Sequence, residues 1–153
     1  MKIKVNKKDL MNEDDAWGAV LTAGTSIKGY KDADDFFLTL NYLNELESGG
    51  HGGLITWSSD IIEELGIHTY IKRLTAMLEK LGAPEYAAIE RQYLEELWRL
   101  NRAMENGEAV MDTYDELIEK SDEKYWQLGE RLLDLMRDHS LIIFKEHIDV
   151  VEE

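Results

Sequence analysis

The chain has no cysteine and only one proline among its 153 residues. The lack of cysteine excludes disulfides, thiolate metal ligands and thiol nucleophiles, and it suits a reducing compartment. One proline and 11 glycines leave few interruptions, so the composition favours long helices over a many-stranded sandwich. No segment approaches the roughly 20 consecutive apolar residues that a membrane span requires. We therefore expect a cytoplasmic protein with no membrane partner.

Cations are also scarce. The sequence has 32 acidic against 17 basic side chains, which gives a formal net charge of −15. Such a charge repels phosphate backbones and anionic lipids and attracts basic surfaces. We expect no direct binding to nucleic acid, and a protein partner with a basic surface, for which a DNA-binding protein is one candidate. The open alternative is that the acidity only keeps the protein soluble. The sequence sets no oligomeric state.

Hydrophobic periodicity predicts a mainly α fold, with one compact multi-helix domain over residues 1–153. The clearest pattern is a 4-3-4-3 spacing between residues 67 and 81 that ends at Gly82, after which Pro84 opens the next helix. Further apolar stripes predict helices from Asn12, from Asp32 up to Gly49, and around residues 110–118. Ser121 is predicted to cap a last long helix. Residues 1–8 form a basic arm or short strand, and residues 141–153 an apolar, then acidic tail.

The same periodicity predicts which side chains form the hydrophobic core. Each member is an apolar residue that recurs at helical spacing. The predicted core is Trp17, Leu21, Phe36, Leu40, Leu43, Ile71, Leu74, Leu78, Tyr93, Leu97, Leu128, Leu132 and Leu135.

A glycine cluster interrupts the chain after the second predicted helix. It reads Gly-Gly-His-Gly-Gly over residues 49–53, which is too rich in glycine for a helix and predicts a tight turn with positive φ angles. Gly49 and Gly50 are expected to serve the architecture of this turn. Residues 54–57 would then be extended, and Ser58 would offer a cap for a short helix that ends near Gly66.

No catalytic or metal-binding motif is present. Glu64 and His68 share a helical face only if a helix runs through Gly66, and two ligands are fewer than a stable metal site needs. The sequence has no nucleophile elbow, and its glycine cluster lacks the Lys-Ser/Thr ending of a phosphate-binding loop. We expect no enzyme activity, no metal and no cofactor. A carboxylate-dependent or metal-dependent hydrolase is the weakest of the functional classes.

An acidic run is the strongest candidate for a binding surface. Between residues 105 and 123 a single cation, Lys120, stands against eight carboxylates: Glu105, Glu108, Asp112, Asp115, Glu116, Glu119, Asp122 and Glu123. If residues 108–119 are helical, four of these carboxylates stack on one face with 4-3-4 spacing. Asp32, Asp34 and Asp35 would extend the surface only if the fold brings that helix start alongside. The competing interpretation is an ordinary solvated helix face.

The segment NYLNELESGG over residues 41–50, continued by LITWSSD over residues 54–60, resembles a bacterial family, the DNA mimic protein nineteen family. In that family a helix ends in Asn-Gly-Gly-Phe and is followed by an aromatic stretch and a polar turn. Residues 71–83 and 114–139 are similar to later parts of the family pattern. The matching structural motif comprises Gly49, Gly50, Trp57, Ser58 and Asp60.

The chain departs from the family pattern at three positions. Ser48 stands where asparagine is usual, His51 where phenylalanine is usual, and Gly53 where glutamine is common. The resemblance implies an all-helical fold. For the member that named the family, it also implies imitation of DNA at the DNA-binding surface of a transcription repressor.

Two hypotheses follow from the sequence. The first is an acidic binding module that occupies the basic surface of a partner protein, with DNA mimicry as one form of this activity. The second is a small regulatory or immunity-type protein that binds its partner by shape, in which the acidity serves only solubility.

Overall fold

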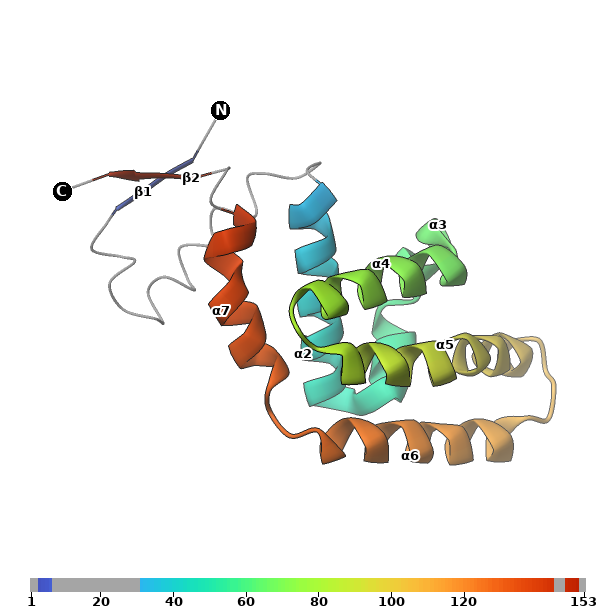
Figure 1. The fold of residues 1–153 in the computed structure, drawn as a ribbon. Helices are drawn as coiled ribbons and strands as arrows, with labels where there is room; N and C mark the ends of the chain where they lie inside the picture. Colours follow the sequence, from blue (N-terminus) through green and yellow to red (C-terminus); the bar gives the residue numbers. More distant parts are fainter. Residues whose placement is uncertain (1–2, 7–30, 145–147, 152–153) are drawn as a thin grey trace.

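The protein is helical, with a small sheet at its termini (Figure 1). A computed structural model describes residues 3–6, 31–144 and 148–151 of the chain. Within this part the helices are α2 (Lys31–Trp57), α3 (Ser59–Leu65), α4 (Ile67–Lys80), α5 (Pro84–Glu105), α6 (Met111–Gln127) and α7 (Leu132–Phe144). Strand β1 (Ile3–Asn6) pairs in parallel with β2 (Ile148–Val151). The predicted mainly α class with short extended ends is confirmed.

Helix α2 folds back on itself at Gly50, where φ is 64° and ψ is −161°. Residues 31–49 descend in Figure 1 and the shorter segment 51–57 rises towards α3. Asn41 donates a hydrogen bond to Ser58 Oγ at 2.9 Å. The predicted five-residue turn is therefore wrong in extent. Gly49, Gly52 and Gly53 lie within helical segments, and of this cluster only Gly50 has a positive φ.

The sequence predicts an extended segment over residues 54–57, but these residues are helical and belong to the part of α2 that follows the bend. Leu54 and Ile55 are fully buried, and the amide of Ser58 donates to the carbonyl of Leu54 at 2.9 Å. Burial of two adjacent apolar residues against the core outweighs the low helix propensity of the preceding glycines.

The hydrophobic core lies between α2, α4 and α5, with contributions from the ends of α6 and α7. Leu74 and Leu78 of α4, and Leu94 and Leu97 of α5, are fully buried along the predicted stripes. Every predicted core residue from Phe36 to Leu135 is buried or half-buried. Trp17 and Leu21 lie outside the described residues, as does the helix predicted from Asn12.

The C-terminal helices divide at a different point from the one predicted. Ser121 does not cap a new helix, because it lies inside α6, is fully buried and donates to the carbonyl of Ile118 at 3.0 Å. The chain breaks instead near Gly129, where φ is 74°. Residues 141–144, which the sequence left as a strand or docked tail, belong to α7.

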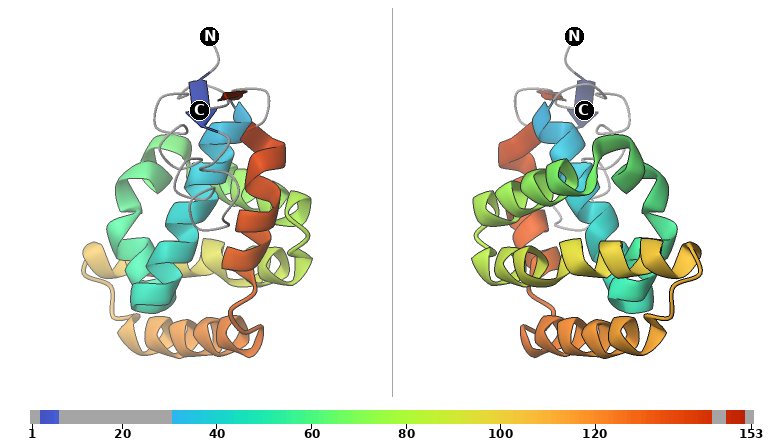
Figure 2. Two further views of the ribbon diagram at one scale, coloured as in Figure 1. Left: turned by 90° about the vertical axis from the view of Figure 1, so that its left-hand side faces the viewer. Right: turned by 90° about the vertical axis from the view of Figure 1, so that its right-hand side faces the viewer.

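Helix α6 runs along one edge of the molecule, beneath α5 and the bend of α2 in each view (Figures 1 and 2). The start of α2 lies at the opposite end. Asp35 there is buried and accepts a hydrogen bond from Arg73 Nε at 2.6 Å. The start of α2 therefore does not extend an acidic surface on α6. Over the described residues, the helices lack the length and apolar character needed to cross a bilayer.

Candidate functional site

Seven of the eight predicted acidic residues are exposed to solvent. Glu105 ends α5, Glu108 lies in the connection to α6, and the other six lie on α6. The eighth residue, Asp122, has a side chain that is only 25% exposed. The structure thus gathers most of the predicted patch along one helix.

The prediction that four carboxylates stack on one face requires residues 108–119 to be helical, and only residues from 111 onwards are. Helix α6 begins at Met111, so Glu108 precedes it and does not join the stack. Asp112, Asp115 and Glu119 remain, because their spacing of three and four residues places them on one helix face. We define the α6 acidic face as the exposed carboxylates of this helix: Asp112, Asp115, Glu116, Glu119 and Glu123.

Few cations neutralise this face. Glu116 pairs with Lys120 at 3.1 Å. Over residues 34–138, no lysine, arginine or histidine forms an ion pair with the rest of the face, which comprises Asp112, Asp115, Glu119 and Glu123. Repulsion between these neighbours is screened by water while the face is free, and an incoming cationic surface would relieve it.

An exposed tryptophan lies next to the α6 acidic face. Trp126 follows Glu123 by three residues and Glu119 by seven, which places its side chain on the same side of the helix. Its side chain is 47% exposed, and its ring packs edge-on against Tyr125 with the centroids 5.1 Å apart. Tryptophan is one of the residues that are enriched at interface hot spots.

Asp122 belongs to a buried network rather than to the outer face. Its Oδ1 accepts from the backbone amide of His51 at 2.8 Å and lies 2.7 Å from the ring Nδ1. The other ring nitrogen lies 2.8 Å from Glu90 Oε1, and Tyr42 donates its hydroxyl to Glu90. One histidine thus joins the bend of α2 to α5 and α6.

Burial alone would lower the pKa of His51, but the charge of Glu90 and the hydrogen bond to Asp122 outweigh it and raise the pKa to about 9. The imidazole is therefore a buried cation at neutral pH, held between two carboxylates. Gly50 makes this arrangement possible, since a Cβ there would lie 2.6 Å from Asp122 Oδ2. The contact between Asp122 and His51 fixes the position of α6 against the bend of α2, and the acidic side of the helix faces solvent.

Sequence reasoning missed this network, because residues 51, 90 and 122 share no motif or regular spacing. The sequence held two signals for this network. His51 lies inside a glycine cluster, and Asp122 follows Glu119 by three residues within the acidic run. His68 contacts Glu95 at 2.8 Å on the surface and not Glu64. His139 and His147 lie outside the side chains described. Within residues 34–138, no three acidic or histidine side chains converge as metal ligands would.

The motif residues taken from the family resemblance have distinct roles. Gly50 makes the bend, and Ser58 is buried at the junction of α2 and α3, where it accepts the Asn41 hydrogen bond. Asp60 is exposed in the first turn of α3. Trp57, in contrast, is 77% exposed at the end of α2 and packs into no core.

Comparison with known proteins identifies the family of the chain. No curated protein and no solved structure matches the chain. A family model described as DMP19-like protein matches residues 31–143, which is the described region from α2 to α7. The bend at Gly50, the long α4–α5 pair and the acidic α6 all lie within that match. The chain therefore belongs to the DMP19-like protein family.

Proposed function

We propose that the protein is an acidic binding module whose α6 acidic face occupies the basic surface of a partner protein. The observation that carries this proposal is the row of exposed carboxylates along α6, most of them without an ion pair among the described side chains. The partner class that fits best is a DNA-binding protein, because its binding surface is already arranged to receive a line of anionic groups.

The charge spacing supports imitation of one edge of DNA. Successive turns of a helix place side chains about 5.4 Å apart along the axis. The phosphates of one DNA strand lie about 3.4 Å apart along its axis. The carboxylates without an ion pair among residues 34–138 follow one another at three- and four-residue spacing, so their charges lie roughly 4.5–6 Å apart along the axis: Asp112, Asp115, Glu119 and Glu123. Membership of the DMP19-like family is consistent with this form of binding.

The first experiment measures capture of a basic partner and its competition with DNA. Partners are isolated from source-cell lysate with the full chain, and each is bound to its own DNA site before the protein is titrated in. We expect the protein to displace the DNA. The paired substitution Asp115→Asn and Glu119→Gln should weaken displacement by about fivefold or more, because two charge contacts are lost.

The fold offers a matched control for this variant. Asp60 and Glu64 are also an exposed Asp–Glu pair at i and i+4, on α3, far from α6 in Figure 1. The substitutions Asp60→Asn and Glu64→Gln change the net charge by the same amount. Equal losses in the two variants would mean that overall charge, and not the α6 acidic face, drives binding.

The exposure of Trp57 favours a second candidate function, in which the protein binds a partner by shape. Trp57 lines an open groove together with Glu45, Ser48 and Gly49, which lie on the segment of α2 before the bend. A tryptophan in such a groove can dominate the energy of an apolar interface. If this candidate is right, Trp57→Ala abolishes capture, the α6 variant does not, and affinity changes little between low and high salt.

A further inference from the structure

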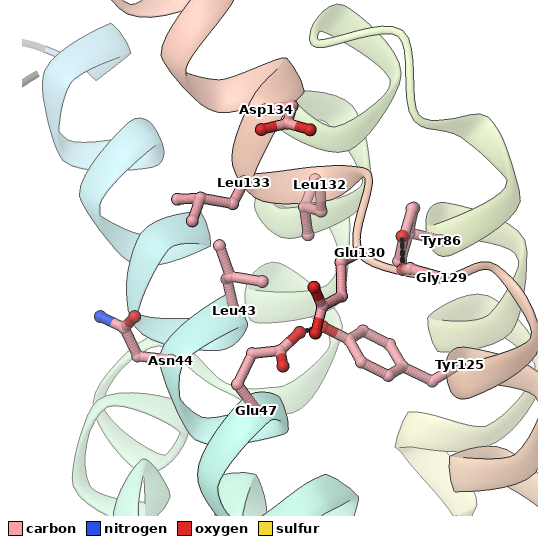
Figure 3. A pocket seen from close by; sticks show the side chains of 10 residues that line it. All are labelled: Leu43, Asn44, Glu47, Tyr86, Tyr125, Gly129, Glu130, Leu132, Leu133 and Asp134. Atoms are coloured by element: carbon pink, nitrogen blue, oxygen red, sulfur yellow. Dashed lines mark hydrogen bonds between the residues drawn. The ribbon is translucent and has the colours of Figure 1, made fainter. Parts of the chain in front are cut away.

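A pocket of about 310 Å³ opens between α2, the end of α6 and the start of α7 (Figure 3). Its volume is near the lower limit of ligand pockets, which span roughly 300–1,000 Å³, so it fits one small ligand. The pocket lies at the C-terminal end of α6, where Tyr125 lines it, and it includes no residue of the α6 acidic face. It is therefore a feature separate from the proposed partner surface.

Carboxylates occupy two ends of this pocket. Glu47 of α2 and Glu130 of the α6–α7 connection point towards the Tyr125 hydroxyl, whereas Asp134 lies beyond the leucines on the first turn of α7 (Figure 3). All three side chains are exposed. Neither Glu130 nor Asp134 forms an ion pair with the side chains of residues 34–138. The neighbouring Arg131 is directed to the carbonyl of Leu128 and to Glu85.

The middle of the pocket is apolar. Leu43 and Leu132 are buried and Leu133 is half-buried, and all three lie between the two carboxylate ends in Figure 3. An apolar wall between charged ends suits a ligand with an alkyl centre and charged termini, since each part of the ligand meets its own kind of surface.

Hydrogen bonds hold the walls of the pocket in place. Tyr125 donates its hydroxyl to Glu47 Oε1 at 3.0 Å, and Tyr86 donates to the carbonyl of Gly129 at 2.9 Å. Burial and the charge of Glu47 raise the pKa of Tyr125, so this hydroxyl remains a donor. Glu47 keeps its second oxygen for a ligand, and the pocket needs little rearrangement to bind one.

We propose that this pocket binds a linear aliphatic diamine. One ammonium group pairs with Glu47 and Glu130, the methylene chain lies against Leu43 and Leu132, and the second ammonium pairs with Asp134. A lysine side chain from a partner offers the same alkyl-ammonium chemistry but only one charge. Because carboxylates lie at both ends of the pocket, a diamine with two ammonium groups fits it better than a lysine side chain with one.

The test is a titration of the full chain with diaminobutane, followed by calorimetry and by amide resonances of residues 129–134. Butylamine supplies one charge on the same alkyl chain, butanediol supplies none, and magnesium supplies two charges without a chain. We expect diaminobutane to bind about fivefold more tightly than butylamine, because it gains one more ion pair. Butanediol and magnesium should leave these resonances unshifted.

Variants locate the site. Glu130→Gln and Asp134→Asn should each weaken diaminobutane binding by about three- to fivefold, and both residues are exposed, so the fold is retained. Glu123→Gln makes the same charge change outside the pocket and should have no effect. Equal affinity for butylamine and diaminobutane would overturn the diamine assignment in favour of a lysine side chain. Equal effects of all three variants, or no binding, would overturn the site.

Discussion

At the scale of single residues, His51 connects three helical segments of the fold. Its side chain is fully buried between Glu90 and Asp122. A buried ion pair contributes less to stability than its Coulomb energy suggests, because both partners must be desolvated. Removing one partner is costly, however, since it leaves an unpaired buried charge. The network therefore acts as a geometric constraint on the position of α6.

The raised pKa of His51 predicts a pH dependence of stability. The folded pKa of about 9 exceeds the unfolded value of 6.5, so the folded state holds the proton more tightly. This stabilisation is complete below pH 6.5 and is lost as the pH rises through 9, with a magnitude of about 3 kcal/mol. Chemical denaturation of the wild type should show this fall, and His51→Gln should lack it. An imidazole titration by NMR with a midpoint near 6.5 would contradict the prediction.

Gly50 and Gly49 should respond oppositely to alanine. Gly50 has a conformation open mainly to glycine, and an added Cβ would meet the Asp122 carboxylate, so Gly50→Ala should destabilise by about 2 kcal/mol or more. Gly49 is helical with open space around it, so Gly49→Ala should stabilise by up to about 1 kcal/mol. Urea denaturation of both variants checks the pair. Similar losses in both would mean that the bend depends on more than one glycine.

At the scale of elements, α6 has a buried side and an exposed acidic side. Its inner side buries Ser121 and Tyr125 and carries the contact of Asp122 with His51. Its outer side bears the α6 acidic face. Under the proposed function, the inner contacts hold the helix in place and the outer carboxylates contact the partner.

Substitutions on the two sides of α6 should have different effects on the free energy of unfolding. Asp115→Asn with Glu119→Gln removes a like-charge i,i+4 pair and should leave the free energy of unfolding unchanged or raise it by about 0.2–0.5 kcal/mol. Asp122→Asn changes one charge on the same helix but breaks the His51 contact, and should destabilise by about 2 kcal/mol or more. Thermal unfolding of the variants checks this contrast. A large loss in the outer pair would show that the acidic face is structural.

At the scale of the whole molecule, the net charge of −15 sets the response to salt. Self-repulsion of a highly charged chain destabilises its compact state, and added salt screens that repulsion. The melting temperature should therefore rise as sodium chloride increases from about 10 mM to about 200 mM, a range that shortens the Debye length severalfold. Calorimetry at constant pH measures the melting temperature at each salt concentration. A fall would mean that surface ion pairs such as Arg91–Glu79 outweigh the repulsion.

The helical periodicity predicted α4 and α5 well, because their apolar residues recur over several turns and each helix is bounded by glycine or proline. It failed around residues 49–57 and at Ser121. In both places a local signal, glycine content or a capping residue, was overridden by burial against distant elements. Intrinsic propensity amounts to at most about 1 kcal/mol per residue, which tertiary packing readily exceeds.

The sequence by itself determined the mainly α class, the family, the core stripes and the presence of an acidic run, because each depends on composition or on spacing along one chain. Only the tertiary structure decided that Asp122 turns inward while Asp115 and Glu119 face solvent. It also decided that Leu43 and Glu47 line one pocket with Glu130 and Asp134. Contacts between residues tens of positions apart leave no periodic trace in a single sequence, and they form only when the helices pack.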